Sequence, residues 1–289
     1  MIESDFMYEE LVPSDALVRV TIVNGKVPVE LNNLLYRHGS FQASENEFLF
    51  HVEGVAKYYI TNGNKIIVEP FAGADITSVK LYILGTALGV IQFQRGVFPI
   101  HGSSVVIDGK CIVITGVTGA GKSTLAMALR KKGYSFLTDD VSAVYLRSDG
   151  TPWVAPGFPQ QKLKRDSAEC NDVDVSSLRK VNVDLEKYYV PVDTGFLCTP
   201  KQLVAVCEII PSHCEEISIR KLHGTQKLMP LINHTYRVEV IPFLKREVDH
   251  FVSCSNIAKQ IQVFQMTRPI DRFTLEDQIE LLVKELKKL

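Results

Sequence analysis

The stretch VITGVTGAGKSTLAMAL, from Val113 to Leu129, decides the fold. It holds the pattern G-x-x-x-x-G-K-S between Gly116 and Ser123, after an apolar run and before a run with helical apolar spacing. A strand, a glycine-rich loop and a helix in this order are the context in which the pattern forms a phosphate-binding loop, or P-loop. The sequence therefore predicts a mixed α/β fold, of the α+β kind, built around a P-loop.

The residues of this loop predict a nucleotide site. Glycines adopt backbone angles that let N–H groups converge on phosphate oxygens, and the following helix adds the partial positive charge of its N-terminus. Lys122 is expected to reach the β- and γ-phosphates, and Ser123 to offer its hydroxyl to Mg²⁺. ATP and Mg²⁺ are thus the predicted cofactors. The predicted nucleotide contacts are Gly116, Thr118, Gly119, Ala120, Gly121, Lys122, Ser123 and Thr124.

Two adjacent carboxylates, Asp139 and Asp140, end an apolar run 17 and 18 residues after Lys122. A strand parallel to the P-loop strand would end beside the phosphates, where a carboxylate can hold Mg²⁺. One aspartate can serve the metal while the other accepts the proton of an attacking hydroxyl, and the sequence leaves open which does which. Repulsion between them is expected to raise the pKa of one. The alternative is an acidic turn without a catalytic role.

Basic and imidazole side chains flank these motifs. His101, in PIHGSS, begins the hairpin that leads into the P-loop strand, and this hairpin can place it near the phosphates. A lone histidine is, however, more often structural. The segment PGFPQQKLKRDSA, residues 156–168, carries Lys162, Lys164 and Arg165. Lys162 and Arg165 are the predicted contacts to an anionic substrate group, such as a chain-terminal carboxylate, and a merely solvated basic loop stays open.

The composition limits the class of protein. The chain has 289 residues, a formal net charge of -1, 46% hydrophobic and 22% charged residues, as in ordinary globular proteins. Near-neutral charge argues against a general nucleic-acid binder. The six cysteines show no C-x-x-C spacing, which favours free thiols in a reducing cytoplasm. The acidic start MIESDFMYEE is not typical of a signal peptide.

The most apolar stretch is LYILGTALGVIQF, residues 81–93. It is shorter than a bilayer span and holds Gln92, so a buried helix is expected and no membrane partner. Asp75 or Thr77 is its expected N-cap, and Gly96 its end.

The chain predicts two domains. Residues 17–71 read as short strands with hairpin signals at Asn24-Gly25 and Asn62-Gly63, which predict a small antiparallel β-rich N-terminal segment over residues 1–74. Residues 75–289 are predicted to form the catalytic domain. It has hairpin signals at Asp108-Gly109 and Asp149-Gly150, no clear period over residues 157–200, and a C-terminal helix with Thr274 and Asp277 as a capping box.

Taken together, the segment HGSSVVIDGKCIVITGVTGAGKSTLAMALRKKGYSFLTDD, residues 101–140, resembles the catalytic domain of the HPr kinase/phosphorylase family. That family has a His-Gly before the hairpin, a P-loop ending in G-K-S and an Asp-Asp pair at this distance. The resemblance implies that His101, Lys122, Asp139 and Asp140 are catalytic. It also implies that Ser123 and the aspartates hold Mg²⁺.

The resemblance extends to EFLFHVEGVAKYYITNGNKIIVEP, residues 47–70, LGTALGVIQFQRGVFPIHGSS, residues 84–104, and PGFPQQKLKRDSA. These segments look like stand-alone HPr kinase-like proteins of bacterial gene clusters. Some members of that branch look like lasso-peptide tailoring kinases, which phosphorylate the C-terminal serine of a precursor peptide. HPr kinases form hexamers, so a homo-oligomer is an open alternative.

Three features depart from the family pattern. Thr124 stands where HPr kinase has an acidic residue, the E-I-R-G-L-G signature has no counterpart in VNVDLEKYYVPVDTGF, and the N-terminal segment is shorter. These differences argue against phosphorylase activity and against HPr as the substrate.

The leading hypothesis is a cytoplasmic serine kinase acting on a precursor peptide. The alternatives are a kinase of a small-molecule hydroxyl or of an HPr-like protein, and a nucleotide-gated binding module with little turnover.

Overall fold

The computed structural model describes residues 2–8, 19–182 and 185–289, and the chain forms two compact units. The first unit comprises Met1–Pro99 and Arg237–Val252, and the second comprises Ile100–Tyr236 and Ser253–Leu289. This division differs from the predicted boundary between residues 74 and 75. The helical segment after residue 75 buries apolar side chains in the core of the first unit, and a segment from late in the sequence joins the same core.

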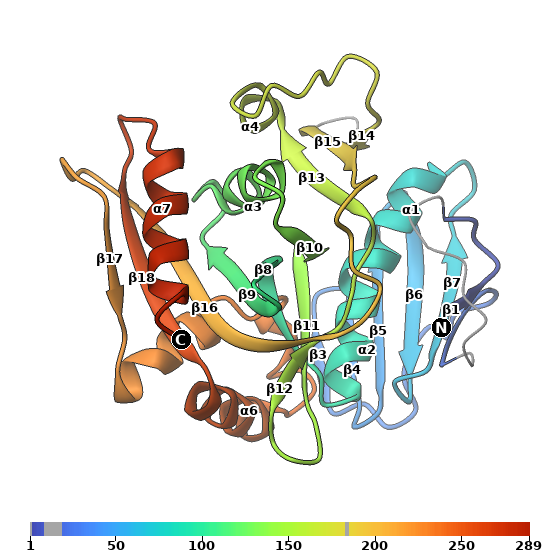
Figure 1. Ribbon diagram of the computed structural model, residues 1–289. Coiled ribbons are helices and arrows are strands. Elements are labelled where there is room, and N and C mark those ends of the chain that lie inside the picture. Colours follow the sequence, from blue (N-terminus) through green and yellow to red (C-terminus); the bar gives the residue numbers. More distant parts are fainter. Residues whose placement is uncertain (1, 9–18, 183–184) are drawn as a thin grey trace. The chain divides into compact units, whose positions relative to one another are not determined.

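The first unit contains a seven-stranded mixed sheet in the order β1-β2-β7-β6-β5-β4-β3 (Figure 1). The first two neighbour pairs, β1 with β2 and β2 with β7, are parallel, and the others are antiparallel. The strands are β1 Ile2–Ser4, β2 Val20–Asn24, β3 Tyr36–His38, β4 Phe41–Ala43, β5 Glu47–Val52, β6 Ala56–Thr61 and β7 Lys65–Pro70.

The two hairpin predictions in this unit have different outcomes. The hairpin at Asn62-Gly63 is confirmed, because β6 and β7 pair across it and both turn residues have positive φ. The hairpin at Asn24-Gly25 is wrong, and the part of its first strand before residue 19 lies outside the described residues. Asn24 donates its N–H to Asp5, and Glu69 accepts the N–H of Val27. These contacts carry the chain past the sheet instead of back along β2.

The predicted helix before Gly96 is confirmed, and it contains an irregularity. It comprises α1 Ile76–Tyr82, a π-helical turn η1 Ile83–Ala87 and α2 Leu88–Gln94. Asp75 is the N-cap and accepts the N–H groups of Thr77 and Ser78. At 19 residues, the whole helix is long and apolar enough to cross a membrane by length and composition alone, whereas the prediction concerned the shorter stretch 81–93 within it. Its side chains Val79, Ile83, Ala87 and Val90 pack in the core of the first unit.

The second unit is organised around a larger sheet. Strands β10, β8, β9, β16, β18 and β17 follow one another in this order, while β11 joins β8 and β12 joins β16. The strands are β8 Phe98–Ile107, β9 Lys110–Gly116, β10 Ser135–Thr138, β11 Val141–Leu146, β12 Pro152–Val154, β16 Lys201–Ser212, β17 Ser218–Lys221 and β18 Gln262–Pro269. The hairpins at Asp108-Gly109 and Asp149-Gly150 are confirmed.

The P-loop strand β9 lies at the centre of this sheet and is buried along most of its length. Its neighbours are β8, which is antiparallel to it, and β16, which is parallel. Strand β10 pairs with β8, so it runs in the same direction as β9 with one strand between them. The turn after β10, with Asp139 and Asp140, therefore lies at the same edge of the sheet as the end of β9.

Residues 157–200, which show no period, hold a separate three-stranded sheet in the order β13-β15-β14. In β13 the buried positions are Gln161 and Leu163, so polar residues occupy both faces of the strand, and β13 pairs with β15 from Gln160 to Lys164. The strands are β13 Gln160–Lys164, β14 Lys180–Asn182 and β15 Leu185–Pro191, and helix α4 Arg165–Glu169 follows β13.

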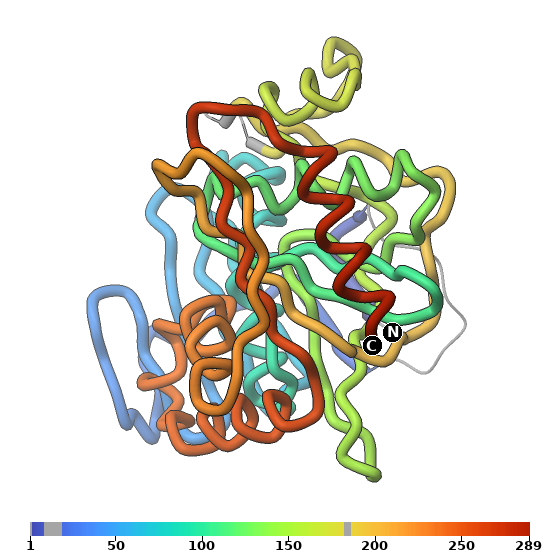
Figure 2. Tube along the Cα trace, turned by 60° about the vertical axis from the view of Figure 1, so that its left-hand side comes forward, coloured from blue at the N-terminus to red at the C-terminus, as the bar shows by residue number. Residues whose placement is uncertain are grey.

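The remaining helical elements of the chain complete the fold. They are α3 Lys122–Lys131, η2 Gly224–Lys227, α5 Leu228–Asn233, η3 Val238–Val240, α6 Glu247–Gln260 and α7 Leu275–Leu286. Helix α7 runs beside α3 (Figures 1 and 2), and both bury leucines in one core. Thr274 is the N-cap of α7, as predicted, but no side-chain capping bond forms. The predicted capping box is wrong because the Thr274 hydroxyl accepts a hydrogen bond from Gln278.

Leu282 offers a test of this packing, since it lies on α7, is fully buried and belongs to the core that α3 and α7 share. We expect Leu282→Ala to lower the free energy of unfolding by about 3 kcal/mol, because it removes buried methyl groups and leaves a cavity. Urea unfolding followed by circular dichroism measures the change. Lys284→Ala, at an exposed position of the same helix, is the matched control. Equal stability of the two variants would contradict the assigned packing.

Candidate active site

The loop between β9 and α3 requires glycine for steric reasons. Gly116, Gly119 and Gly121 have φ of 142°, 84° and 104°, a region that other residues disfavour. A Cβ on Gly116 would lie 2.6 Å from the carbonyl oxygen of Ile209 in β16. The strand that carries the loop can therefore approach β16 closely only because residue 116 lacks a side chain.

Lys122 begins α3 and folds back over the loop. Its side chain is buried, and Nζ donates to the carbonyl oxygens of Gly116 at 2.9 Å and Val117 at 3.1 Å. Burial lowers the pKa of Lys122, while the carboxylate of Asp140 opposes that shift. The ammonium group is thus held at the mouth of the loop by neutral acceptors, which an anion could replace.

Asp139 ties three segments together. Its Oδ1 accepts hydrogen bonds from the hydroxyl of Ser103 in β8 and, at 3.3 Å, from the hydroxyl of Ser123 in α3. Its Oδ2 accepts the backbone N–H of Lys162 in β13 at 2.8 Å. The carboxylate therefore lies directly beside Ser123, the predicted metal partner.

Asp140 points to a different set of partners. Its Oδ2 accepts from Lys162 Nζ at 2.9 Å, and its Oδ1 lies 3.9 Å from Lys187 Nζ. Its φ of 69° is in the left-handed region, which aspartate tolerates better than most residues. With this backbone angle at Asp140, the two adjacent carboxylates have different hydrogen-bond partners.

The sequence predicts a raised pKa for one of the two aspartates, whereas the pKa of Asp140 is lowered. Burial acts to raise it, but the ammonium groups of Lys162 and Lys187 outweigh burial and hold the pKa well below its ordinary value. The same pairing raises the pKa of Lys162 against the effect of burial. Attraction to two lysines, not repulsion between the aspartates, therefore sets the ionisation of Asp140.

His101 lies on β8 next to this turn. Its Nδ1 donates to the backbone carbonyl oxygen of Asp140 at 2.9 Å, because a carbonyl can only accept. In the neutral imidazole, Nε2 then keeps its lone pair. Burial and the charge of Lys122 lower the pKa of His101, and the carboxylate of Asp140 partly offsets them. The structure thus brings His101, Lys122 and Asp140 together.

Backbone contacts hold His101 from both sides. Its N–H donates to the carbonyl oxygen of His234 at 2.7 Å, and its carbonyl oxygen accepts from the hydroxyl of Thr115 at 2.7 Å. The His234 ring contacts Glu208 at 2.8 Å, and the amide of Gln265 donates to the other carboxylate oxygen of Glu208. Sequence reasoning missed this buried cluster, since its members come from distant segments with no motif.

The predicted substrate contacts have different placements. Lys162 lies among the residues that line the main cavity, but its ammonium group is paired with Asp140. Arg165 is not among the lining residues, which differs from its predicted role. It donates to Glu186 at 3.1 Å and to the hydroxyl of Tyr188. Lys164 and Lys187, which were not predicted as site residues, do line the cavity.

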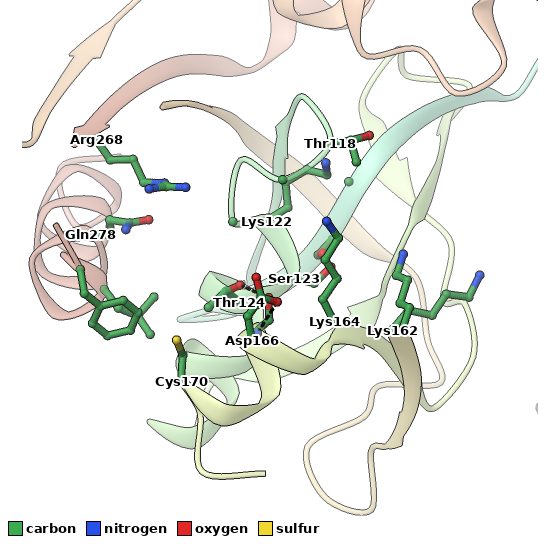
Figure 3. A pocket seen from close by; sticks show the side chains of 18 of the residues that line it. Thr118, Lys122, Ser123, Thr124, Lys162, Lys164, Asp166, Cys170, Arg268 and Gln278 are labelled. Carbon is green, nitrogen blue, oxygen red and sulfur yellow. Dashed lines mark hydrogen bonds between the residues drawn. The ribbon is translucent and has the colours of Figure 1, made fainter. Parts of the chain in front are cut away.

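One cavity of about 310 Å³ connects these groups (Figure 3). Lys162 and Lys164 lie on one side of it, Lys122 lies in the middle, and Arg268 and Gln278 lie on the other side. Its lining includes His101, Thr118, Gly119, Gly121, Lys122, Ser123, Thr124 and Asp140 among the predicted residues, and Cys170, Lys187, Arg268, Arg272, Phe273 and Gln278 among those that sequence reasoning missed. Gly116, Ala120 and Asp139 are not among the lining residues.

Buried side chains fix the start of α3. Gln161, which is fully buried, donates its amide N–H to the carbonyl oxygen of Ser123 at 2.8 Å and accepts from Arg130 at 3.0 Å. The hydroxyl of Thr124 donates to that of Ser167 in α4 at 3.0 Å. The backbone that carries Ser123 and Thr124 is thus held by β13 and α4.

The oxygen atoms of Ser123 and Asp139 are suitable ligands for Mg²⁺. A hydroxyl oxygen of Ser123 and a carboxylate oxygen of Asp139 lie side by side, and hard oxygen ligands suit this ion. Within residues 2–8, 19–182 and 185–289 there is no group of three or more His, Cys, Asp or Glu side chains that could hold a metal. Mg²⁺ bound through one carboxylate, waters and substrate phosphates needs no such group.

The contacts of His101 predict how its pKa responds to a charge change. We expect it to titrate below an ordinary histidine, and Asp140→Asn to lower its pKa further, because the loss of the carboxylate removes the charge that favours imidazolium. NMR titration of the imidazole, assigned with His101→Gln, measures this shift. Asp271→Asn removes an exposed carboxylate beside His213 and should leave His101 unchanged. A rise in the His101 pKa in Asp140→Asn would contradict the arrangement.

Comparison with known proteins gives partial matches. No family model matches the chain. Over 57 residues it is 40% identical to the HPr kinase/phosphorylases of three strains of Streptococcus thermophilus. This match covers 20% of the chain and 18% of each relative, so the chain matches about a fifth of the relatives' length. The Hpr(Ser) kinase/phosphatase from Coxiella burnetii aligns over 65% of this chain and 95% of its own, at 14% identity and a TM-score of 0.36. The chain is distantly similar to the HPr kinase/phosphorylase family.

Proposed function

We propose that this protein is an ATP-dependent kinase that transfers the γ-phosphoryl group of ATP to a serine hydroxyl of a peptide. One observation carries the proposal. The glycine-rich loop with Lys122, the Ser123–Asp139 pair and the His101–Asp140 pair meet around one cavity. A phosphate grip, a metal position and a proton acceptor are the parts that phosphoryl transfer needs.

The two aspartates have separate roles in this proposal. Asp139 and Ser123 hold Mg²⁺, since their oxygens are adjacent and Asp139 is fixed by its other two donors. Mg²⁺ there would neutralise charge on the β- and γ-phosphates. Lys122 exchanges its carbonyl partners for phosphate oxygens and stabilises the charge of the transferred group. Asp140, which lines the cavity, faces the acceptor.

In the transfer step, the serine oxygen forms a bond to the γ-phosphorus while the bond from that phosphorus to the β–γ bridging oxygen breaks. ADP leaves, and the serine proton passes to the carboxylate of Asp140. Because the pKa of Asp140 is lowered, it orients the hydroxyl first and receives the proton late, when the new bond has formed. The Nε2 lone pair of His101 is available as a second acceptor beside it.

Lysines supply the grip on the acceptor. Lys162 and Lys187 neutralise Asp140, and Lys164 lines the same side of the cavity. A substrate carboxylate that draws Lys162 away would free Asp140 for the hydroxyl. A C-terminal serine places its α-carboxylate beside its hydroxyl, which suits this exchange. The acceptor we propose is therefore the C-terminal serine of a precursor peptide, as in the lasso-peptide kinases that the sequence resembles. Arg165, paired with Glu186 outside the cavity lining, takes no part in this proposal.

Mass spectrometry tests the proposal directly. The protein is incubated with ATP, Mg²⁺ and a peptide ending in serine, and a phosphoryl mass increment on that serine is expected. Asp140→Asn should lower kcat about 100-fold or more, because it removes the proton acceptor. Asp139→Asn should raise the Mg²⁺ concentration needed for half-maximal rate. The control is Asp149→Asn, an exposed carboxylate that accepts from Thr151 in the turn between β11 and β12 and does not line the cavity.

A second series of assays compares three other phosphoryl acceptors. They are the same peptide with an amidated C-terminus, free serine, and an HPr-like protein. A large rise in KM for the amidated peptide supports the carboxylate grip. If the enzyme prefers free serine or the HPr-like protein, the proposed acceptor is wrong and the proposed kinase activity stands. Full activity in both Asp140→Asn and Asp139→Asn would overturn the assigned chemistry, and ATP binding without transfer to any hydroxyl would favour a binding module.

A further inference from the structure

The cavity has a second end that the proposed chemistry does not use. Beyond Lys122, on the side away from Lys162 and Lys164, it is lined by Arg268 and Gln278 (Figure 3). Arg272, Phe273, Thr274 and Leu275, which lie between these two in the sequence, also line the cavity. These residues come from the end of β18, the start of α7 and the turn between them. The side chains at this end are an aromatic ring, an amide and guanidinium groups, whereas the other end holds Asp140 and lysines.

The direction of a triphosphate follows from these two ends. If Asp140 receives the acceptor proton, the γ-phosphate faces the Asp140 end of the cavity. The β-phosphate then lies over the glycine loop near Lys122, and the α-phosphate and nucleoside extend the opposite way. We propose that Phe273 and Gln278 form the nucleobase subsite and that it binds adenine, through its ring face and its 6-amino group. This inference rests on the proposed kinase function.

Phe273 supplies the surface on which a base can stack. Its side chain is 63% exposed although it is a large aromatic residue, and it lines the cavity. The two residues that follow it hold its backbone in place, because Thr274 is buried as the N-cap of α7 and Leu275 is buried in the core. An exposed ring on a rigid support is a stacking platform that loses little entropy on binding.

Arg268 holds this segment against the phosphate loop. Its Nε donates to the carbonyl oxygen of Ala120 at 2.9 Å, and its Nη1 donates to the carbonyl oxygen of Pro269 at 2.9 Å. Gly121 lies beside the same guanidinium, since a Cβ there would be 3.6 Å from Nε. The nucleobase end and the phosphate end of the cavity are thus joined by direct hydrogen bonds within the second unit.

Gln278 supplies selectivity. Its side chain is buried, and its amide N–H donates to the hydroxyl of Thr274 at 3.3 Å. The amide oxygen accepts no hydrogen bond from the described residues, so it is left for a donor on the ligand. The amino group of adenine can donate to it, whereas the carbonyl oxygen at the corresponding position of guanine cannot.

Calorimetric binding of ADP and of pyrophosphate tests the subsite, since these two probes differ by adenosine and need no turnover. We expect Phe273→Ala to weaken ADP about tenfold and pyrophosphate less than about twofold, because only the base stacks on the ring. Phe273→Trp should restore ADP affinity. The matched control is Ile270→Ala, which removes an exposed apolar side chain from the same turn but not from the cavity lining.

Gln278→Leu should reduce the preference for ADP over GDP about fivefold, the value of one hydrogen bond, with pyrophosphate unchanged. Thermal melting of each variant verifies that it is folded.

The outcomes separate the two proposals. If Phe273→Ala weakens the affinity for ADP and for pyrophosphate equally, or weakens neither, the base subsite is wrong. The nucleotide site at the glycine loop is still supported in that case if ADP binding depends on Lys122. If the wild-type protein binds neither ADP nor pyrophosphate, the proposed function fails, and the subsite fails with it.

Discussion

The carboxylate of Asp139 is the contact on which the arrangement of the site depends. It accepts hydrogen bonds from Ser103, Ser123 and the backbone of Lys162, which belong to β8, α3 and β13. Hydrogen bonds to an ionised acceptor are about twice as strong as neutral ones, so one charge can fix three segments. The loop, the hairpin and the three-stranded sheet meet here, and the cavity exists because they meet.

Asp139 and Asp140 are adjacent in the sequence but have different surroundings. A left-handed backbone angle at Asp140 turns its side chain from the serines towards two lysines. Asp139 is thus hydrogen-bonded by neutral donors, and Asp140 is paired with charges. Two carboxylates that would repel in a common site instead have different partners. The lysines offset the charge of Asp140, so an anion entering the cavity would have to compete for ammonium groups that are already paired.

The centre of the fold and the phosphate-loop side of the candidate site could be predicted from local sequence. The run into Gly116, the glycine spacing and the helix after Lys122 are contiguous, and turn residues mark the hairpin that carries His101. What failed depends on distant partners. The strands within residues 157–200 mix lysines with buried residues and are stabilised by pairing with each other, so no period marks them. Lys187, Phe273 and Gln278 reach the cavity by tertiary folding alone. The hairpin at Asn24-Gly25 failed because contacts with Asp5 and Glu69 outweigh a local turn preference.

The discontinuous first unit has a consequence for synthesis. Its core contains Val240, Ile241 and Leu244, whereas its sheet is complete by Pro70. On the ribosome, residues 100–236 emerge between these two parts. At roughly 5–20 residues per second, the nascent sheet waits about 7 to 30 s with part of its apolar surface uncovered. During that interval the incomplete unit is the segment of the growing chain most in need of a chaperone.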